Sequence, residues 1–298
     1  MEKFKYPEVK TDYIEQIKEK LINDQDILML IKKLNLTKED VFEEAIIFLE
    51  WLKDHKYCKD CKGLQMCNKG HLGYRLDIDE NLQQSLVPCE YLQSKENLIA
   101  HKRNYLLCDL SDKNLTTSLD EIDLSNEPAY YRDIVNITKQ WVRHLPKKGL
   151  YFYGGLGVGK TYLASAICND LARKGYKVAF VNYPKLCSDI RNNVTEYDYV
   201  DSRIRKLRRA TLLVIDDIGA ESVTNYIRDD ILFPILDYRM EHELRTIFTS
   251  NCDLESLKDR MTLSKGGEED ETKALRIIER IKTLCNTVLI KGTSRRSL

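Results

Sequence analysis

The fold is decided by one segment, Gly154-Gly155-Leu156-Gly157-Val158-Gly159-Lys160-Thr161. It matches the P-loop pattern of Gly, four residues, Gly, Lys and Ser or Thr at every required position. An apolar run at residues 150–153 precedes it, and an amphipathic stretch at 161–174 follows it and stops at Gly175. A strand before the loop and a helix after it let the loop amides and the helix N-terminus face phosphates. The segment therefore predicts an ATP site rather than a glycine-rich turn.

A second, acidic element stands at residues 212–217, where the apolar run Leu-Leu-Val-Ile ends in Asp216 and Asp217. We expect Lys160 to neutralise phosphate oxygens, Thr161 and Asp216 to bind Mg²⁺, and Asp217 to act as a general base. The alternative is that both aspartates cap the next turn. Asp is shorter than the Glu of many ATPases, so hydrolysis is expected to be slow or partner-dependent. The residues expected to bind nucleotide and magnesium are Gly154, Gly155, Gly157, Val158, Gly159, Lys160, Thr161, Tyr162 and Asp216.

Two later features add polar groups to this prediction. Asn251 follows the apolar run at 246–249, and it would lie beside the γ-phosphate if that strand neighbours the Asp216 strand. Strands often end in Asn for reasons of turn formation alone. Arg276 and Arg280 share one face of a predicted helix. Such an arginine can stabilise transition-state charge at a neighbouring subunit, or it can belong to a solvated, salt-bridged helix face.

The surrounding pattern predicts an α/β fold in which strands alternate with helices. Strands are expected at residues 150–153, 178–181, 212–215 and 246–249. Alternation of this kind indicates a mainly parallel sheet covered on both faces. The first fifty residues instead show helical spacing, with Thr37 as an N-cap. We expect a helical domain at 1–95, a connector at 96–115 and the P-loop domain at 116–298.

Four of the nine cysteines fall within a short stretch, residues 58–89. The pair Cys58 and Cys61 has the spacing that lets two thiolates meet one Zn²⁺, and Cys67 and Cys89 complete a tetrahedron. His71 is the rival fourth ligand. The alternatives are free buried cysteines or a redox pair. A closed zinc site would contribute folding free energy to this small domain.

Composition restricts location and partners. The apolar runs are too short to span a bilayer, and the N-terminus lacks the apolar core of a secretory signal. We therefore expect the protein to stay in the reducing cytoplasm. Lys plus Arg equals Asp plus Glu, 47 to 47, so a grip on nucleic acid needs a local patch. The candidate patch, which is otherwise a solvated helix face, consists of Arg203, Arg205, Lys206, Arg208 and Arg209.

Taken in order, the cysteine-rich helical front, GGLGVGKT, LLVIDDIGAE, TSN and ALRIIER resemble the DnaI/DnaC type of primosomal helicase loader, an AAA+ ATPase. The likeness covers nearly the full chain and is greater to the DnaI branch. LLVIDDIGAE with IRDDILFPILDYRM supports that branch, and the cysteine-rich front separates the chain from related transposition helper ATPases. Where the family pattern leads us to expect a His after Gly73 and Tyr74, this chain has Arg75, which favours Cys67 or His71 as replacement ligand.

The resemblance implies a protein that uses ATP to deliver a hexameric replicative helicase onto single-stranded DNA. The zinc domain would dock on the helicase, and the P-loop domain would bind ATP and DNA and self-associate. It implies Asn251 as sensor 1, Arg280 as arginine finger and Arg295 or Arg296 as sensor 2. The competing hypotheses are a transposition helper ATPase, a small-molecule kinase, and a switch that binds ATP without hydrolysing it.

Overall fold

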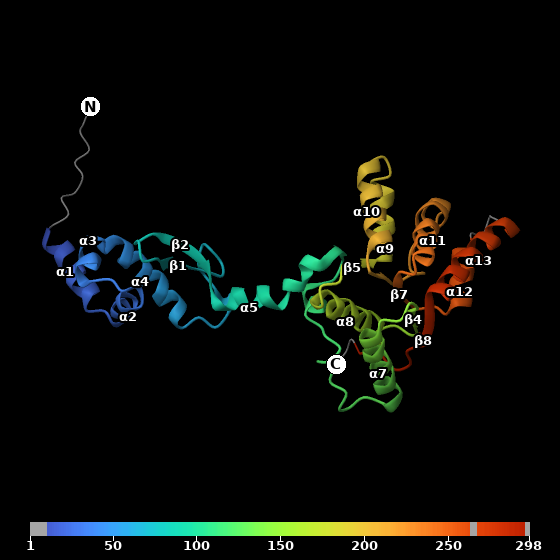
Figure 1. Cartoon of the computed structure of the whole chain (residues 1–298), viewed down its shortest axis with the longest axis horizontal. Coiled ribbons are helices and arrows are strands. Elements are labelled where there is room, and N and C mark those ends of the chain that lie inside the picture. Colours follow the sequence, from blue (N-terminus) through green and yellow to red (C-terminus); the bar gives the residue numbers. More distant parts are fainter. Residues whose placement is uncertain (1–10, 263–266, 296–298) are drawn as a thin grey trace. The chain divides into compact units, whose positions relative to one another are not determined.

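The computed structural model describes residues 11–262 and 267–295, which fall into two compact units, Met1–Asn97 and Leu98–Leu298. The first unit is mainly helical, and the second is built around a large sheet (Figure 1). Within the described ranges, none of the helices combines the length and apolarity that a membrane span requires.

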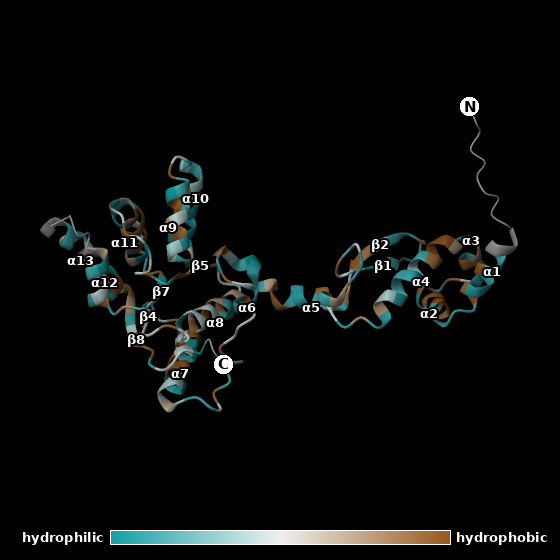
Figure 2. Ribbon diagram, turned by 180° about the vertical axis from the view of Figure 1, so that it is seen from behind, coloured by the Kyte–Doolittle hydropathy of each residue, from teal (hydrophilic) through white to brown (hydrophobic). Residues whose placement is uncertain are grey.

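Four helices form the core of the first unit. Brown and teal alternate along these helices in Figure 2, as expected for helices that bury only one face. Buried side chains from α1, α2, α3 and α4 pack together around Ile27, Val41 and Phe48. The bounds are α1 Thr11–Ile22, α2 Gln25–Leu34, α3 Lys38–Glu43 and α4 Ala45–Lys59.

The predicted cap at Thr37 is confirmed. Its hydroxyl accepts a hydrogen bond from the Asp40 amide, and the Asp40 carboxylate accepts one from the Thr37 amide. This capping box begins α3, and the chain then turns at Glu44 into α4. After a short 3-10 helix at Leu64–Met66, the strands β1 Tyr74–Ile78 and β2 Gln84–Pro88 form an antiparallel hairpin, and α5 Glu90–Leu98 ends the unit.

The second unit contains six parallel strands in the order β3-β5-β6-β7-β4-β8. The four strands expected from the sequence are present as β4, β5, β6 and β7, and the predicted α/β fold is confirmed. The strands β3 and β8 lie at the two edges of the sheet and were not expected. The bounds are β3 Tyr105–Cys108, β4 Gly149–Tyr153, β5 Val178–Asn182, β6 Leu212–Asp216, β7 Arg245–Ser250 and β8 Cys285–Leu289.

Alternate residues of the central strands face opposite layers of helices. In β6, Leu213 and Ile215 belong to one buried cluster, whereas Leu212 and Val214 belong to the other. Covering both faces explains why these strands read as continuous apolar runs. The bounds are α6 Asp112–Leu115, α7 Ala129–His144, α8 Lys160–Arg173, α9 Tyr183–Asn192, α10 Tyr197–Arg209, α11 Phe233–Glu241, α12 Leu254–Met261 and α13 Gly267–Leu284, with a 3-10 helix at Ala100–Asn104 and a π-helix at Tyr226–Leu232.

The connector expected at residues 96–115 is different in the structure, because the second unit begins at Leu98. Its strand β3 pairs with β5, and α6 follows within the same stretch. Few residues of this stretch are fully buried, so its sequence shows little hydrophobic periodicity although it forms a strand and a helix.

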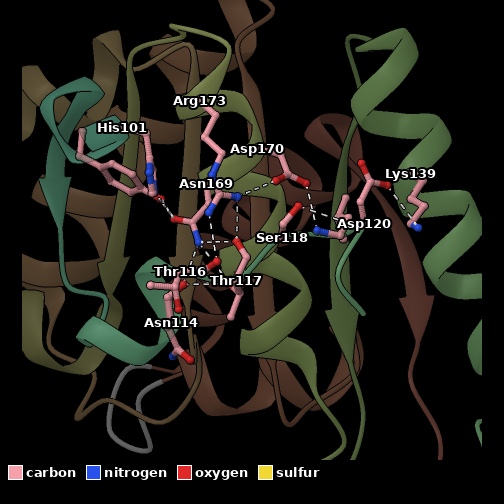
Figure 3. A network of polar contacts seen from close by, with 12 residues as sticks. His101, Asn114, Thr116, Thr117, Ser118, Asp120, Lys139, Asn169, Asp170 and Arg173 are labelled. Atoms are coloured by element: carbon pink, nitrogen blue, oxygen red, sulfur yellow. Dashed lines mark hydrogen bonds and ion pairs between the residues drawn. The ribbon is translucent and has the colours of Figure 1, made fainter. Parts of the chain in front are cut away.

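A polar network fastens this stretch to α8 (Figure 3). The Asn169 amide nitrogen donates to the carbonyl oxygens of Asn114 and Thr117 at 2.7 and 2.9 Å. The Asn169 amide oxygen accepts from the Tyr105 hydroxyl at 2.6 Å and lies 3.2 Å from His101 Nε2. Asn169 is fully buried. Hydrogen bonds therefore join residues 98–117 to α8, the helix that follows the P-loop.

Candidate nucleotide-binding site

The P-loop lies between β4 and α8, as its sequence context predicted. Gly154 and Gly157 have φ values of 145° and 76°, which a residue with a Cβ rarely adopts. A Cβ on Gly154 would also lie 2.1 Å from the Ile290 carbonyl oxygen. Because α8 begins at Lys160, its N-terminal amides and those of the loop face the same space. This is the backbone arrangement that holds phosphate groups.

Lys160 is held inside the loop by three oxygen acceptors. Its ammonium group donates to the carbonyl oxygens of Gly154 and Gly155 at 3.0 and 2.7 Å and to Asn251 Oδ1 at 2.8 Å. The side chain is buried. These acceptors hold the cation in place at the point where a β- or γ-phosphate would carry negative charge.

Asp216, at the end of β6, joins the loop to the sheet. Its Oδ1 accepts hydrogen bonds from the hydroxyls of Thr161 at 2.8 Å and Thr249 at 2.7 Å. Burial raises the pKa of this carboxyl, and the nearby Asp217 charge raises it further, while the two hydroxyls oppose the change. Thr161 and Asp216 thus present oxygen atoms to one small space, which suits Mg²⁺.

Asp217 and Asn251 contact each other beside Lys160. Asn251 Nδ2 donates to Asp217 Oδ1 at 3.2 Å, so one amide side chain links Asp217 to Lys160. Asp217 has a φ of 61°, and its backbone N–H donates to the Thr249 hydroxyl. The strands β6 and β7 are adjacent and parallel, which brings the predicted residues of both strand ends together.

Sequence reasoning missed two residues that shape this edge. Thr249 bonds to both Asp216 and the Asp217 amide, and only its place in the run before Asn251 could have pointed to it. Glu221 accepts a hydrogen bond from the Gly219 amide at 2.7 Å and thereby holds the turn after Asp217. Burial raises the pKa of Glu221.

The C-terminal segment also reaches the loop. The Arg295 amide donates to the Gly157 carbonyl at 3.0 Å, and its guanidinium forms two hydrogen bonds with Glu127. Tyr162, another expected nucleotide residue, lies in the first turn of α8, is partly exposed, and has a pKa raised by burial. Arg296 lies outside the described residues.

The paired arginines of α13 contact α11. Arg280 Nε forms an ion pair with Asp237 at 2.9 Å, and its guanidinium lies 5.2 Å from the centre of the Phe233 ring. Arg276 lies over the same ring at 5.8 Å. Asp237 and Phe233 both belong to α11, so these contacts of the two arginines lie away from the P-loop of the same chain. Their position is that of a helix-face pair that packs against α11.

The four clustered cysteines all line one cavity of about 700 Å³ in the first unit, whereas His71 is exposed and lies outside it. Lys69 Nζ lies 3.4 Å from the Cys58 thiol and pairs with Asp54. Backbone N–H groups of Gly73 and Lys69 lower the pKa of Cys67. Among the described residues, no group of three or more Cys, His, Asp or Glu side chains is arranged to hold a metal, so the zinc site stays a prediction. All nine thiols are free.

The basic run lies on α10 and is partly paired. Arg203 contacts Asp189 at 3.4 Å and the Tyr199 ring, and Arg205 pairs with Asp201 at 2.7 Å. The guanidinium of Arg208 lies 5.9 Å from the Tyr238 ring. These contacts agree with the helix-face alternative and lower the net charge that the run offers to nucleic acid.

Comparison with known proteins agrees with this geometry. Residues 80–298 match the family model of IstB-like ATP binding proteins. The chain is 30% identical to the replicative helicase loader DnaI of Bacillus subtilis, and the match covers 95% of this chain and 93% of that protein. It is 27% identical to the replicative helicase loader DnaC of Buchnera aphidicola, over 70% of this chain and 86% of the relative.

Solved structures give the same result. A crystal structure of DnaI superposes with a TM-score of 0.56 and 32% identity, covering 63% of this chain and 98% of that one. A putative primosome component from Streptococcus pyogenes has a TM-score of 0.53 and 29% identity, covering 66% of this chain and 98% of that one. The chain therefore belongs to the IstB-like ATP-binding proteins and, among them, to the DnaI/DnaC family.

Proposed function

We propose that this chain loads a hexameric replicative helicase onto single-stranded DNA, as a primosomal protein, and that ATP binding and hydrolysis at the P-loop drive the loading. The extent of the likeness to DnaI carries this proposal, because it includes both units of the chain. A putative ATP-binding protein of the insertion sequence IS232 matches less of the chain, 76%, at 24% identity. We expect the first unit to be the part that contacts the helicase.

At the P-loop, each polar side chain has a proposed task. When nucleotide binds, the Lys160 ammonium group exchanges its carbonyl acceptors for phosphate oxygens. Negatively charged phosphate oxygens form stronger hydrogen bonds with an ammonium group than neutral carbonyl oxygens do. Thr161 and Asp216 hold Mg²⁺, which would neutralise charge on the β- and γ-phosphates. Asp217 accepts a proton from the attacking water while Asn251 orients it and contacts the γ-phosphate.

The arginine finger is proposed to act between subunits. Arg280 is partly exposed on α13, so a neighbouring copy could receive it at its own P-loop. The chain would then self-associate when ATP is bound. Loss of a transition-state contact lowers turnover without lowering nucleotide affinity.

The test combines the full chain with the replicative helicase of the same cell and circular single-stranded DNA, and it measures helicase loaded on the circle. ATP is expected to increase loading, and Lys160→Ala is expected to abolish both nucleotide binding and loading. ATP turnover is measured in parallel. Loading that requires ATP binding without any turnover would favour the switch, which the short Asp217 side chain makes physically reasonable. Absence of helicase binding would refute the loader.

We also propose that Cys58, Cys61, Cys67 and Cys89 bind a structural Zn²⁺. Four thiols around one cavity are a donor set that suits zinc, and His71 does not line that cavity. Metal analysis of the purified full chain is expected to give one zinc per chain, and Cys67→Ser is expected to lose it. Chelation should unfold the first unit and leave ATP binding by the second intact. A metal-free chain with an unchanged melting profile would rule this site out.

A further inference from the structure

The residues that follow β8 run along the P-loop. The Ile290 amide donates to the Tyr153 carbonyl at 2.7 Å, just before the loop begins, and the Arg295 amide donates to the Gly157 carbonyl at 3.0 Å, inside it. Packing between these two points is close. A Cβ on Gly157 would lie 2.2 Å from the Ser294 hydroxyl oxygen. We call residues 290–295 the strap.

The strap is fastened at its far end by the Arg295 side chain. Its two terminal nitrogens donate to the two oxygens of the Glu127 carboxylate at 2.5 and 2.8 Å. Its guanidinium carbon lies 3.7 Å from the centre of the Tyr131 ring. Both side chains of the ion pair are about three quarters covered, at 26% and 23% exposure. A planar, two-bonded pair that also stacks on an aromatic ring is geometrically specific.

The same aromatic ring reaches the loop. Tyr131 is 1% exposed, in the first turn of α7, and a Cβ on Gly159 would lie 3.3 Å from its hydroxyl oxygen. Nearer the sheet, the Tyr130 hydroxyl donates to the Lys291 carbonyl. The loop residues Gly157 and Gly159 are therefore enclosed between the beginning of α7 and the strap.

We propose that Glu127 and Tyr131 are positioning residues which, through Arg295, hold the strap across the P-loop and preorganise the loop for the phosphates that ATP and ADP share. Loop amides wrap the α- and β-phosphates, and a loop already held in that form loses less conformational freedom on binding. The strap touches Gly157 and Gly159, whereas Asp217 and Asn251 lie on the Lys160 side of the site. Opening the strap therefore lowers the affinity of the chain for ATP and for ADP by the same factor.

This inference rests on nucleotide binding at the P-loop. It differs from a role for Arg295 as a sensor of the γ-phosphate, since such a residue would affect ATP and leave ADP unchanged. The ratio of the two affinities is the quantity that separates these roles.

The test measures the affinity of the full chain for fluorescent ADP and for a non-hydrolysable fluorescent ATP analogue. Glu127→Gln and Arg295→Ala are expected to weaken both by about tenfold, which corresponds to about 1.4 kcal/mol. Arg295→Lys keeps the charge but not the two-bonded geometry and should be intermediate. The double variant Glu127→Gln with Arg295→Ala should bind nucleotide no more weakly than Arg295→Ala alone, because both substitutions break the same ion pair. Tyr131→Phe retains the ring and should bind nearly as the wild type does.

A second measurement reports the strap itself. Trypsin cleavage after Lys291, followed by mass spectrometry on the folded full chain, should be faster in Glu127→Gln than in the wild type. The matched control is Lys139→Ala on α7, which removes an ion pair with the exposed Asp120 and should change neither readout. Nucleotide should slow the cleavage in the wild type.

Two results would overturn the strap. One is faster cleavage in Glu127→Gln with unchanged affinity for both nucleotides, and the other is a loss of affinity confined to the ATP analogue. Failure of the wild type to bind either nucleotide, with Lys160→Ala as reference, would instead refute the nucleotide site on which the strap depends.

Discussion

At the residue scale, the site concentrates groups that are costly to bury. Asp216 is 5% exposed, and two hydroxyl groups donate hydrogen bonds to its carboxylate. Its raised pKa shows that burying the charged form costs folding free energy. Asp217 adopts a left-handed backbone conformation beside it. Such features concentrate at functional sites. If stability alone mattered, a well-packed neutral side chain would serve better at this position than a buried carboxylate.

Asp216→Asn is expected to separate stability from function. A carboxyl whose pKa is raised by folding destabilises the fold fully at pH values above the raised pKa, and this cost declines as the pH falls towards the ordinary value of 3.8. The amide removes the buried charge and still offers an oxygen to Thr161 and Thr249. Thermal unfolding of the nucleotide-free variant should therefore occur at an equal or higher temperature, while magnesium-dependent ATP binding should fall at least tenfold. A lower unfolding temperature would contradict this account.

At the element scale, α8 connects the P-loop to the stretch that follows the first unit. Lys160 begins the helix, and Asn169 and Asp170 bond residues 114–119 at its other end (Figure 3). Every polar atom of the Asn169 amide has a partner. The phosphate loop and residues 114–119 therefore contact opposite ends of the same helix.

Asn169→Ala is expected to destabilise the second unit by about 3 kcal/mol, because it leaves several buried donors and acceptors unpaired. Chemical denaturation followed by Trp141 fluorescence, in a Trp51→Phe background, would measure the change. Asn192→Ala, at an exposed position near the end of α9, is the control and should have little effect. A loss below about 1 kcal/mol would mean that water replaces the network.

His101 makes the same contact sensitive to pH. Burial lowers its pKa below the ordinary value of 6.5, so the unfolded chain binds a proton that the folded chain does not. Its contribution is fully present above about pH 6.5 and is lost as the pH falls further. Hydrogen exchange of residues 98–117 should therefore accelerate between pH 7.5 and 5, after correction for the intrinsic rate. His101→Gln should reduce this acceleration, and an unchanged profile would exclude the histidine as its cause.

At the scale of the whole molecule, the proposed role of Arg280 as an arginine finger would have one copy of the chain complete the P-loop site of another. The Arg280 side chain contacts Asp237 and Phe233 of its own chain. Two different defects should then complement each other.

Mixing is the corresponding experiment. Lys160→Ala keeps Arg280 but binds no nucleotide, whereas Arg280→Ala binds nucleotide but lacks the finger. Each alone should have no stimulated ATP turnover in the presence of helicase and single-stranded DNA, and the mixture should recover a measurable part of it. Asp237→Asn breaks the ion pair and retains the finger, so it should remain active. Normal turnover by Arg280→Ala would exclude the role in trans.

Local patterns were sufficient for much of this protein. The P-loop, the four central strands, the Thr37 cap and the family follow from short runs, because glycine conformation, strand burial and helix capping are set by near neighbours. The edge strands β3 and β8 were missed because each pairs with only one other strand and is partly exposed.

The sequence by itself therefore determined the nucleotide loop, the acidic strand end and the α/β class. Only the tertiary structure decided which distant residues meet there. Glu127, Tyr131 and Arg295 lie up to 168 positions apart and have no shared motif, and Asn169 finds its partners across about 50 to 70 positions. The reason is physical, since a buried polar group is satisfied by whichever donor the fold brings within about 3 Å, and sequence spacing does not encode that distance.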